Sequence, residues 1–402
     1  MRGLMYVFVV LAMCIFTSIL QKFFGHQALM AGLSDQVVTL VSYGCLVAAA
    51  ICAGVQRLEV RRMFALWLPM VAFVTASVLW SPVADDTLRK VISWSLLLFG
   101  MSLFCAAHTR GVLERVLGLL AIVASLGSFV TDLIAPGITH AFANNMFVGI
   151  FIHKSFLADA CSFGGLVALY HALEKRSVFW MLIFAGCVAG VAMAETWSAI
   201  FGMGLGVFVL VSRRFIRTIF LACWGLSVSL PLFNQLIPAN LIVDYLGRDM
   251  TFSGRIYLWD YAFQAMDGRI LLGSGFNNIG NMPAWDDFMI MIFQGEQIVA
   301  NHTHNLWVET LYMGGVVGVV GLAFYLIVLP LMRFDRTRPH HILLMSFLIY
   351  VAFTSALKVP FFSNSLSSVM TLYVLCIFVR DGARRHGQAA AMATRDLGSR
   401  IS

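Results

Sequence analysis

Charged residues are scarce in this sequence. Asp, Glu, Lys and Arg make up 12% of its 402 residues, whereas hydrophobic residues make up 60%. A soluble domain carries roughly a quarter charged residues and needs a polar shell over its core. The composition therefore excludes an ordinary soluble enzyme and predicts that the chain lies in a membrane.

Two further features are absent. The eight cysteines show no spacing typical of a disulfide framework or a zinc site, and all of them fall inside apolar runs. The sequence also shows no internal repeat, which counts against a transporter built from two inverted halves.

Long apolar runs are present instead, and runs of about 17–25 residues predict transmembrane helices. We expect an all-α integral membrane protein with about twelve of them and one large periplasmic loop. The runs lie near residues 4–20, 36–55, 63–80, 91–107, 112–131, 156–172, 177–194, 197–212, 217–233, 305–330, 341–357 and 365–379.

The positions of the basic residues predict the topology. With the N-terminus inside, 19 of the 27 Lys and Arg residues fall on the cytoplasmic side, as the positive-inside rule requires. The net charge of +7 is therefore a topology signal and gives no reason to expect nucleic acid as a partner. Arg2 precedes the first apolar run, which lacks a small-residue cleavage site, so we expect an uncleaved anchor.

Three regions follow from this pattern. Residues 1–380 form the polytopic transmembrane domain, and residues 234–304 within it form the large periplasmic loop. Residues 381–402 form a basic cytoplasmic tail that we expect to be disordered.

The long loop contains one predicted helix. Ser253 is a suitable N-cap for a helix, and an apolar stripe follows at Ile256, Trp259, Phe263 and Met266. Such a stripe is typical of a helix lying on the membrane surface, and equally of a helix packed within the loop. Both interpretations remain open at this point.

Two histidines and an acid lie where the long loop enters the tenth apolar run. These are His302, His304 and Glu309. An unperturbed imidazole titrates near ~6.5, so His304 is a candidate general base. The alternatives are that both histidines lie at the interface without a catalytic role, or that they bind a metal. The second is the weaker alternative, because the nearby acids show no recognisable ligand spacing.

Basic residues near these histidines are candidates for binding an anion. Arg255 lies in the first turn of the predicted loop helix, where backbone N–H groups and a guanidinium favour phosphate. A salt bridge to Asp249 or Asp260 is the structural alternative. Lys154 precedes the sixth run and either extends to the interface, faces the same cavity as Arg255, or pairs with Asp159 or Glu195.

Several short motifs resemble the O-antigen ligase and O-antigen/exopolysaccharide polymerase superfamily. His304-Asn305 is followed after nine residues by Gly-Val-Val-Gly at 315–318, and Gly-Arg-x-x-x-Trp at 254–259 is followed by Gly-Ser-Gly-Phe at 273–276. The stretch 149–154 resembles the exopolysaccharide-polymerase branch, and Leu-Trp-Ser at 79–81 before a Leu-Arg helix start also fits. The resemblance covers roughly residues 70–330.

The resemblance implies a fold of about twelve helices and metal-independent transfer of glycan from undecaprenyl pyrophosphate. His304 and Arg255 would be the catalytic residues, as the base and the pyrophosphate ligand. The expected substrate-binding residues are Lys154, Arg89, Asn305, His302, Trp259 and Glu309. No metal or other cofactor is expected.

The chain departs from the family pattern at three points. The second arginine of the ligases is missing from Thr-Trp-Ser-Ala at 196–199, so that either Lys154 or Arg89 supplies that charge or the site is weaker. Ser155 replaces the usual Asn after the lysine. Val319 stands where the ligases have threonines after the glycine motif.

These observations predict a glycosyltransferase of the bacterial inner membrane that polymerises exopolysaccharide or O-antigen repeat units on the periplasmic face. A ligase that moves finished glycan onto lipid A-core or another acceptor is the nearest alternative. A transporter or lipid flippase is the alternative of another class. Expected partners are a lipid-linked oligosaccharide, membrane lipids and other polysaccharide-assembly proteins.

Overall fold

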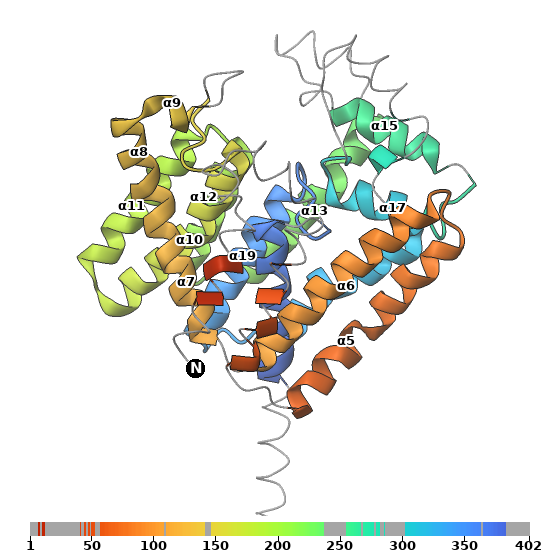
Figure 1. The fold of residues 1–402 in the computed structure, drawn as a ribbon, viewed down its shortest axis with the longest axis horizontal. Helices are drawn as coiled ribbons and strands as arrows, with labels where there is room; N and C mark the ends of the chain where they lie inside the picture. The colour runs from red at the N-terminus through yellow and green to blue at the C-terminus, as the bar shows by residue number, and fades with distance from the viewer. Residues whose placement is uncertain are drawn as a thin grey trace, which may run out of the picture.

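A computed structural model describes most of the chain. It covers residues 57–107, 110–140, 146–236, 255–266, 268–276, 279–281, 285, 302–362 and 365–382, with separate residues between 7 and 12 and between 41 and 52. Within these residues the protein is helical, and its β-structure is a single bridge between His140 and Phe147. The prediction of an all-α protein is confirmed for this part of the chain (Figure 1).

The main helices follow one another along the chain with short connections. They are α5 (Arg57–Ala76), α6 (Ala84–Ala106), α7 (Arg110–Ile122), α8 (Ser128–Ile134), α9 (Pro136–Thr139), α10 (Lys154–Lys175), α11 (Val178–Met193), α12 (Trp197–Ser212), α13 (Ile216–Leu236), α15 (Arg255–Ala265), α17 (Leu306–Ala323), α18 (Leu329–Arg333) and α19 (Pro339–Thr354). Short 3-10 and π segments extend or join them: η1 (Ser77–Leu79), η2 (Val123–Gly127), η3 (Ile279–Asn281) and η4 (Phe324–Val328). Residues 366–382 form a final helix.

Six helices in the described part of the chain are long and apolar enough to cross a membrane. They are Val60–Leu79, Ala84–Ala106, Leu113–Ile134, Lys154–Lys175, Ile216–Phe233 and Leu306–Arg333. The apolar helices α11, α12 and α19 have 16 residues each, about 24 Å, which is less than the ~30 Å of a hydrocarbon core. The prediction of twelve spans is therefore not confirmed. The first two predicted spans fall mainly on residues outside the described ranges.

The helices form two groups with α13 and α19 between them (Figure 1). One group contains α7, α8, α10, α11 and α12, and the other contains α5, α6 and α17 with α15 above them. Helix α10 is the centre of the first group, because it packs on α7, α11, α12 and α19. Glycines allow this approach: a Cβ on Gly164 would come within 2.7 Å of the Ala121 Cβ.

Helix α17 is broken at Gly315, whose backbone lies at φ 60° and ψ −160°. The break frees backbone groups that a membrane would leave unsatisfied, and a turn after α15 bonds them. The N–H groups of Val316 and Val317 donate to the carbonyls of Ile270 and Leu271 at 2.9 and 3.2 Å. In return, the N–H groups of residues 274 and 275 donate to the carbonyls of residues 312 and 313 at 2.8 and 3.0 Å.

This backbone exchange explains the glycine motifs. A Cβ on Gly315 would lie 2.3 Å from the Leu271 carbonyl, and a Cβ on Gly273 would lie 2.6 Å from the Gly315 nitrogen. Both glycines have positive φ. The motifs at 273–276 and 315–318 therefore meet as two backbones in contact, and Trp80 Nε1 donates to the Leu272 carbonyl at 3.3 Å beside them.

The predicted loop helix is present as α15, and its apolar stripe packs into the protein. Ile256, Trp259 and Met266 are buried, and Phe263 is half-buried. The helix contacts α17 and α13. The interpretation as packed loop structure is therefore favoured over a helix lying on the membrane surface. Its predicted cap, Ser253, lies outside the described residues.

Candidate functional site

The loop before α17 is held by Asn305. Its Oδ1 accepts hydrogen bonds from the N–H groups of Trp307 and Val308 at 2.9 and 3.0 Å, which caps the helix. Its Nδ2 donates to the carbonyls of Ser227 and Ala356, each at 3.1 Å, which ties the cap to α13 and to the end of α19. Asn305 is fully buried and holds the loop that carries His304, and its predicted contact with substrate stays a prediction.

Thr303 lies between the two histidines in the sequence, and two hydrogen bonds made by its backbone fix its position. Its N–H donates to Glu309 Oε2 at 2.7 Å, and its carbonyl accepts from Trp259 Nε1 at 2.9 Å. Glu309 is 1% exposed and Trp259 is 0% exposed. These two residues, expected to bind substrate, therefore hold the histidine loop from inside the protein.

His302 and His304 lie side by side, with ring centroids 4.2 Å apart, and both line one cavity. In a helix, residues two apart would point in different directions and could not share a cavity equally. Both histidines precede α17, which begins only at Leu306, so this helical geometry does not apply to them. His304 itself has φ 57°, an uncommon backbone conformation for a residue other than glycine.

The shared cavity has a volume of about 320 Å³, and most of the residues that line it carry polar side chains. Besides the two histidines it is lined by His153, Ser155, Phe156, Asp159, Lys358, Val359, Pro360, Ser365 and Ser367. The wall thus comes from the start of α10, the loop before α17, and the segment between α19 and the final helix. These three parts of the chain are far apart in the sequence.

Asp159 is the buried carboxylate of this cavity. Its Oδ1 accepts from Lys358 Nζ at 2.7 Å and from the hydroxyl of Tyr350, and its Oδ2 accepts from Ser367 Oγ at 2.9 Å. We considered Lys154 as a partner for Asp159, and the structure assigns that place to Lys358. The paired and hydrogen-bonded arrangement is what a buried charge requires.

The expected basic residues are placed differently. Arg255 begins α15 and is half-buried, with no ion pair among the described residues, although its predicted alternative partner Asp249 lies outside them. Lys154 begins α10 next to the cavity residue His153. Arg89 is exposed and pairs with Asp86 at 3.8 Å.

The next residue after Arg89, Lys90, faces the protein instead. Its Nζ lies 3.3 Å from the Met313 Sδ and 5.1 Å from the centroid of the Phe276 ring. Lys90 and Lys358 are therefore the two cations that the sequence interpretation missed. Choosing Lys90 over Arg89 would have required knowing which face of α6 packs against a distant part of the chain.

The histidines of the site are neutral at physiological pH. Burial lowers the pKa of His304 to about 2, and the neighbouring His302, Arg255 and His153 act in the same direction. Burial also lowers the pKa of His302, where Glu309 opposes the effect and Lys90 adds to it. The pKa of His153 is lowered by burial and then by Lys154 and Lys358.

The buried Nδ1 of His302 has no hydrogen-bond partner among the described residues. The Nδ1 of His153 accepts from the N–H of Ser155 at 3.1 Å, so neutral His153 carries its proton on Nε2. The cavity thus contains imidazoles, hydroxyl groups and a lysine–carboxylate pair, which suit proton transfer and binding of a polar substrate.

Among the described residues, one group of three side chains is close enough together to bind a metal ion. It consists of His340, His341 and Asp381 and lies outside the histidine cavity. The Nδ1 of His341 accepts from the N–H of Asp335, so its Nε2 carries a proton and donates to Asp381. Arg338 and Arg380 also contact that carboxylate, at 3.7 and 3.4 Å. These contacts describe an ion-paired carboxylate. The acids near the histidine loop, Asp286, Asp287 and Glu296, lie outside the described residues.

Comparison with known proteins agrees with the motifs. The model of the O-antigen ligase family matches residues 158–323. A protein of Rickettsia prowazekii (strain Madrid E) named "Putative polysaccharide ligase" is 25% identical over 143 residues, which are 34% of this chain and 34% of that protein. The alignment therefore spans about a third of the length of this relative. The predicted resemblance is confirmed: residues 158–323, which include Arg255, Trp259 and His304, resemble the O-antigen ligase family.

Proposed function

We propose that this protein is a metal-independent glycosyltransferase of the bacterial inner membrane that acts on undecaprenyl-pyrophosphate-linked glycan at the periplasmic face. It polymerises exopolysaccharide or O-antigen repeat units. One observation carries the proposal: a neutral His304 lines the same cavity as Lys358 and lies close enough to Arg255 for that cation to lower its pKa. Glycosyl transfer from a pyrophosphate needs a proton acceptor and positive charge at the leaving group.

In the proposed reaction an acceptor hydroxyl attacks the anomeric carbon of the donor glycan. The new glycosidic bond forms as the bond between that carbon and the pyrophosphate oxygen breaks. His304 takes the hydroxyl proton, and the pyrophosphate leaves with the bonding electron pair, stabilised by Arg255 and nearby lysines. Removing the base typically lowers the rate by ~10²–10⁴-fold.

The strength of the base depends on the donor in this scheme. With a pKa of about 2, the imidazole of His304 is available at neutral pH but is a weak proton acceptor. Part of the lowering comes from Arg255. A pyrophosphate beside Arg255 would offset that positive charge and raise the pKa of His304, while the larger effect of burial would remain. The base would then be stronger when the donor is bound.

Ligation of finished glycan to a separate acceptor is the second candidate. The family description and the name of the Rickettsia relative favour it. The chemistry at His304 is the same for both candidates, and only the acceptor differs. A polymerase takes the hydroxyl of another lipid-linked unit, whereas a ligase takes that of a different molecule.

Transport is the candidate of another class. A broken transmembrane helix and a buried carboxylate are features of transporters, and α17 and Asp159 supply both. The freed backbone groups at Gly315 are bonded to residues 270–275, however, and Asp159 is paired with Lys358. We therefore favour the enzyme.

The deciding experiment uses the purified full-length protein in detergent with a lipid-linked oligosaccharide. His304→Ala should abolish product, and Arg255→Lys should lower it strongly because lysine loses the bidentate fork. His171→Ala is the matched control, because His171 lies in α10 away from the cavity lining. A ladder of products indicates polymerisation, and single transfer to an added acceptor indicates ligation. Full activity of a folded His304→Ala protein would contradict the proposal.

A further inference from the structure

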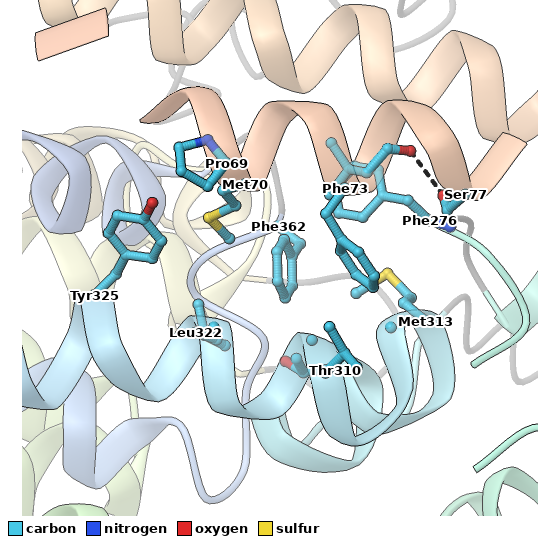
Figure 2. A pocket seen from close by; sticks show the side chains of 15 residues that line it. Pro69, Met70, Phe73, Ser77, Phe276, Thr310, Met313, Leu322, Tyr325 and Phe362 are labelled. Atoms are coloured by element: carbon cyan, nitrogen blue, oxygen red, sulfur yellow. Dashed lines mark hydrogen bonds between the residues drawn. The ribbon is translucent and has the colours of Figure 1, made fainter. Parts of the chain in front are cut away.

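A second cavity, apolar and of about 210 Å³, lies between α5 and α17. Figure 2 shows its walls: Met70 and Phe73 from α5 face Leu322 of α17 and Tyr325 of η4, and Phe276 and Phe362 also line the groove. We call it the α5–α17 groove. At one end of the groove, the Phe276 N–H donates a hydrogen bond to Ser77 Oγ at 2.9 Å.

Glycines leave parts of the α17 wall of the groove without side chains. Gly314, Gly318 and Gly321 of α17 line it. A Cβ on Gly318 would lie 3.7 Å from the Phe73 ring, and a Cβ on Gly321 would meet no atom within 4 Å. The groove therefore has room for a chain with methyl branches along a helix face.

A cation lies at the loop end of the groove. Phe276 and Met313 line that end, and both contact Lys90, at 5.1 Å from the Phe276 ring centroid and 3.3 Å from the Met313 Sδ. An apolar slot with a lysine at one end complements an amphiphile that carries an anionic head on a single hydrocarbon chain.

The groove is close to the histidine cavity. Lys358, Val359 and Pro360 line the cavity, and Phe362 lines the groove, so one short segment separates the two. Lys90 also acts electrostatically on His302, a residue of the cavity. A head group at Lys90 thus lies between an apolar site and a polar one.

We propose that the α5–α17 groove binds the isoprenoid chain of the lipid-linked donor next to its pyrophosphate, with Lys90 at the junction of chain and head. The assignment rests on the proposed function. The groove extends from Thr310 in α17 to Tyr325 in η4, and both lie in the helix Leu306–Arg333, which is long and apolar enough to cross a membrane. The chain would enter the membrane along α17 while the glycan faces His304.

Binding is tested without relying on turnover. The full-length protein is mixed with a polyprenyl pyrophosphate that carries a photoreactive diazirine on an isoprene unit near the head, and labelled peptides are mapped. We expect labelling of α5 and α17, suppressed by unlabelled polyprenyl pyrophosphate and not by phosphatidylglycerol. Labelling elsewhere, or equal suppression by the phospholipid, would overturn the proposal.

A matched pair of substitutions tests the groove itself. Gly321→Leu places a side chain in the groove, and Gly225→Leu places the same side chain on α13, where a Cβ also meets no atom within 4 Å. We expect Gly321→Leu to weaken labelling at least about tenfold, about 1.4 kcal/mol, with Gly225→Leu unchanged. Equal labelling of both proteins would refute the groove assignment.

Failure of the proposed function gives a different result. If the groove is labelled as expected but the wild-type protein transfers no glycan, the groove assignment stands and the enzyme is rejected. If His304→Ala loses turnover and keeps labelling, chain binding and chemistry are separate, as the geometry requires.

Discussion

Asn305 accepts hydrogen bonds with its Oδ1, which caps α17, and donates hydrogen bonds with its Nδ2 to two carbonyls. Replacing it with aspartate distinguishes the two contributions, because aspartate keeps the acceptor and loses the donor. As an N-cap, aspartate performs about as well as asparagine, so capping alone predicts a neutral change. In the structure, however, the Nδ2 of Asn305 donates to the carbonyls of Ser227 and Ala356 at 3.1 Å each. Asn305→Asp would place a carboxylate oxygen against those two oxygens in a fully buried position.

The expected magnitudes follow from these contacts. Asn305→Ala loses the cap, which costs ~0.5–2 kcal/mol, and leaves two buried carbonyls unsatisfied at ~1–3 kcal/mol each. We expect a net loss of about 3 kcal/mol in the free energy of unfolding. Asn305→Asp keeps the cap and adds a buried, unpartnered charge, so we expect it to lose ~3–5 kcal/mol.

The assay is denaturant or thermal unfolding of the purified protein in detergent, followed by glycan transfer at a temperature where all variants are folded. Both variants should also lower kcat, because Asn305 adjoins His304 and fixes the start of α17. Asn305→Asp that unfolds like the wild type, while Asn305→Ala is destabilised, would show that only the cap matters. That result would refute the proposed cross-link between α17, α13 and α19.

Four further outcomes are expected. Gly315→Ala should abolish folded protein in size-exclusion chromatography, because its Cβ would lie 2.3 Å from the Leu271 carbonyl, whereas Gly321→Ala should elute normally; a normal Gly315→Ala profile would contradict the backbone contact. Asp159→Asn should lower the free energy of unfolding by about 3 kcal/mol because Lys358 loses its charge partner, and Lys358→Met in the same chain should recover part of it in thermal melts. The protein should lose stability as pH falls below ~6.5, because His304 takes up a proton in the unfolded chain but stays neutral when buried in the folded protein. The free energy of unfolding should fall by up to about 1.4 kcal/mol per pH unit for this one histidine, and melts of His304→Gln should show a shallower dependence on pH. If donor binding raises the pKa of His304, the acid limb of kcat/KM, which reports the free enzyme, should lie well below pH 6, and the acid limb of kcat should lie at higher pH. Coincident limbs near pH 6.5 would exclude an effect of the donor on the pKa of His304.

The helices were predictable from the sequence because their signal is local. Apolar length places α10, α11, α12 and α13 within a few residues of their observed bounds, and the described part of the chain contains little else. Six helices of spanning length are established, fewer than the twelve predicted. Helices α11, α12 and α19 are shorter, and the first two predicted spans fall mainly outside the described residues. The start of α6 was placed seven residues too late, because its first turns contain charged residues.

The candidate site was predictable only in part. His304 and His302 were found from residue type and position, and the cavity contains both. Asn305, Trp259 and Glu309 were chosen as substrate ligands, but their buried hydrogen bonds make them supports of the histidine loop. Nothing in a linear pattern distinguishes a polar side chain that contacts substrate from one that holds its neighbour.

The sequence by itself determined that this chain is helical and apolar, and it located the loop that carries His304. These properties depend on composition and on neighbours within one helix turn. Only the tertiary structure decided that Lys358 pairs with Asp159, 199 residues away, and that Lys90 and not Arg89 faces inward. Such choices depend on which helix faces which, because a buried charge is tolerated only where another part of the chain supplies its partner.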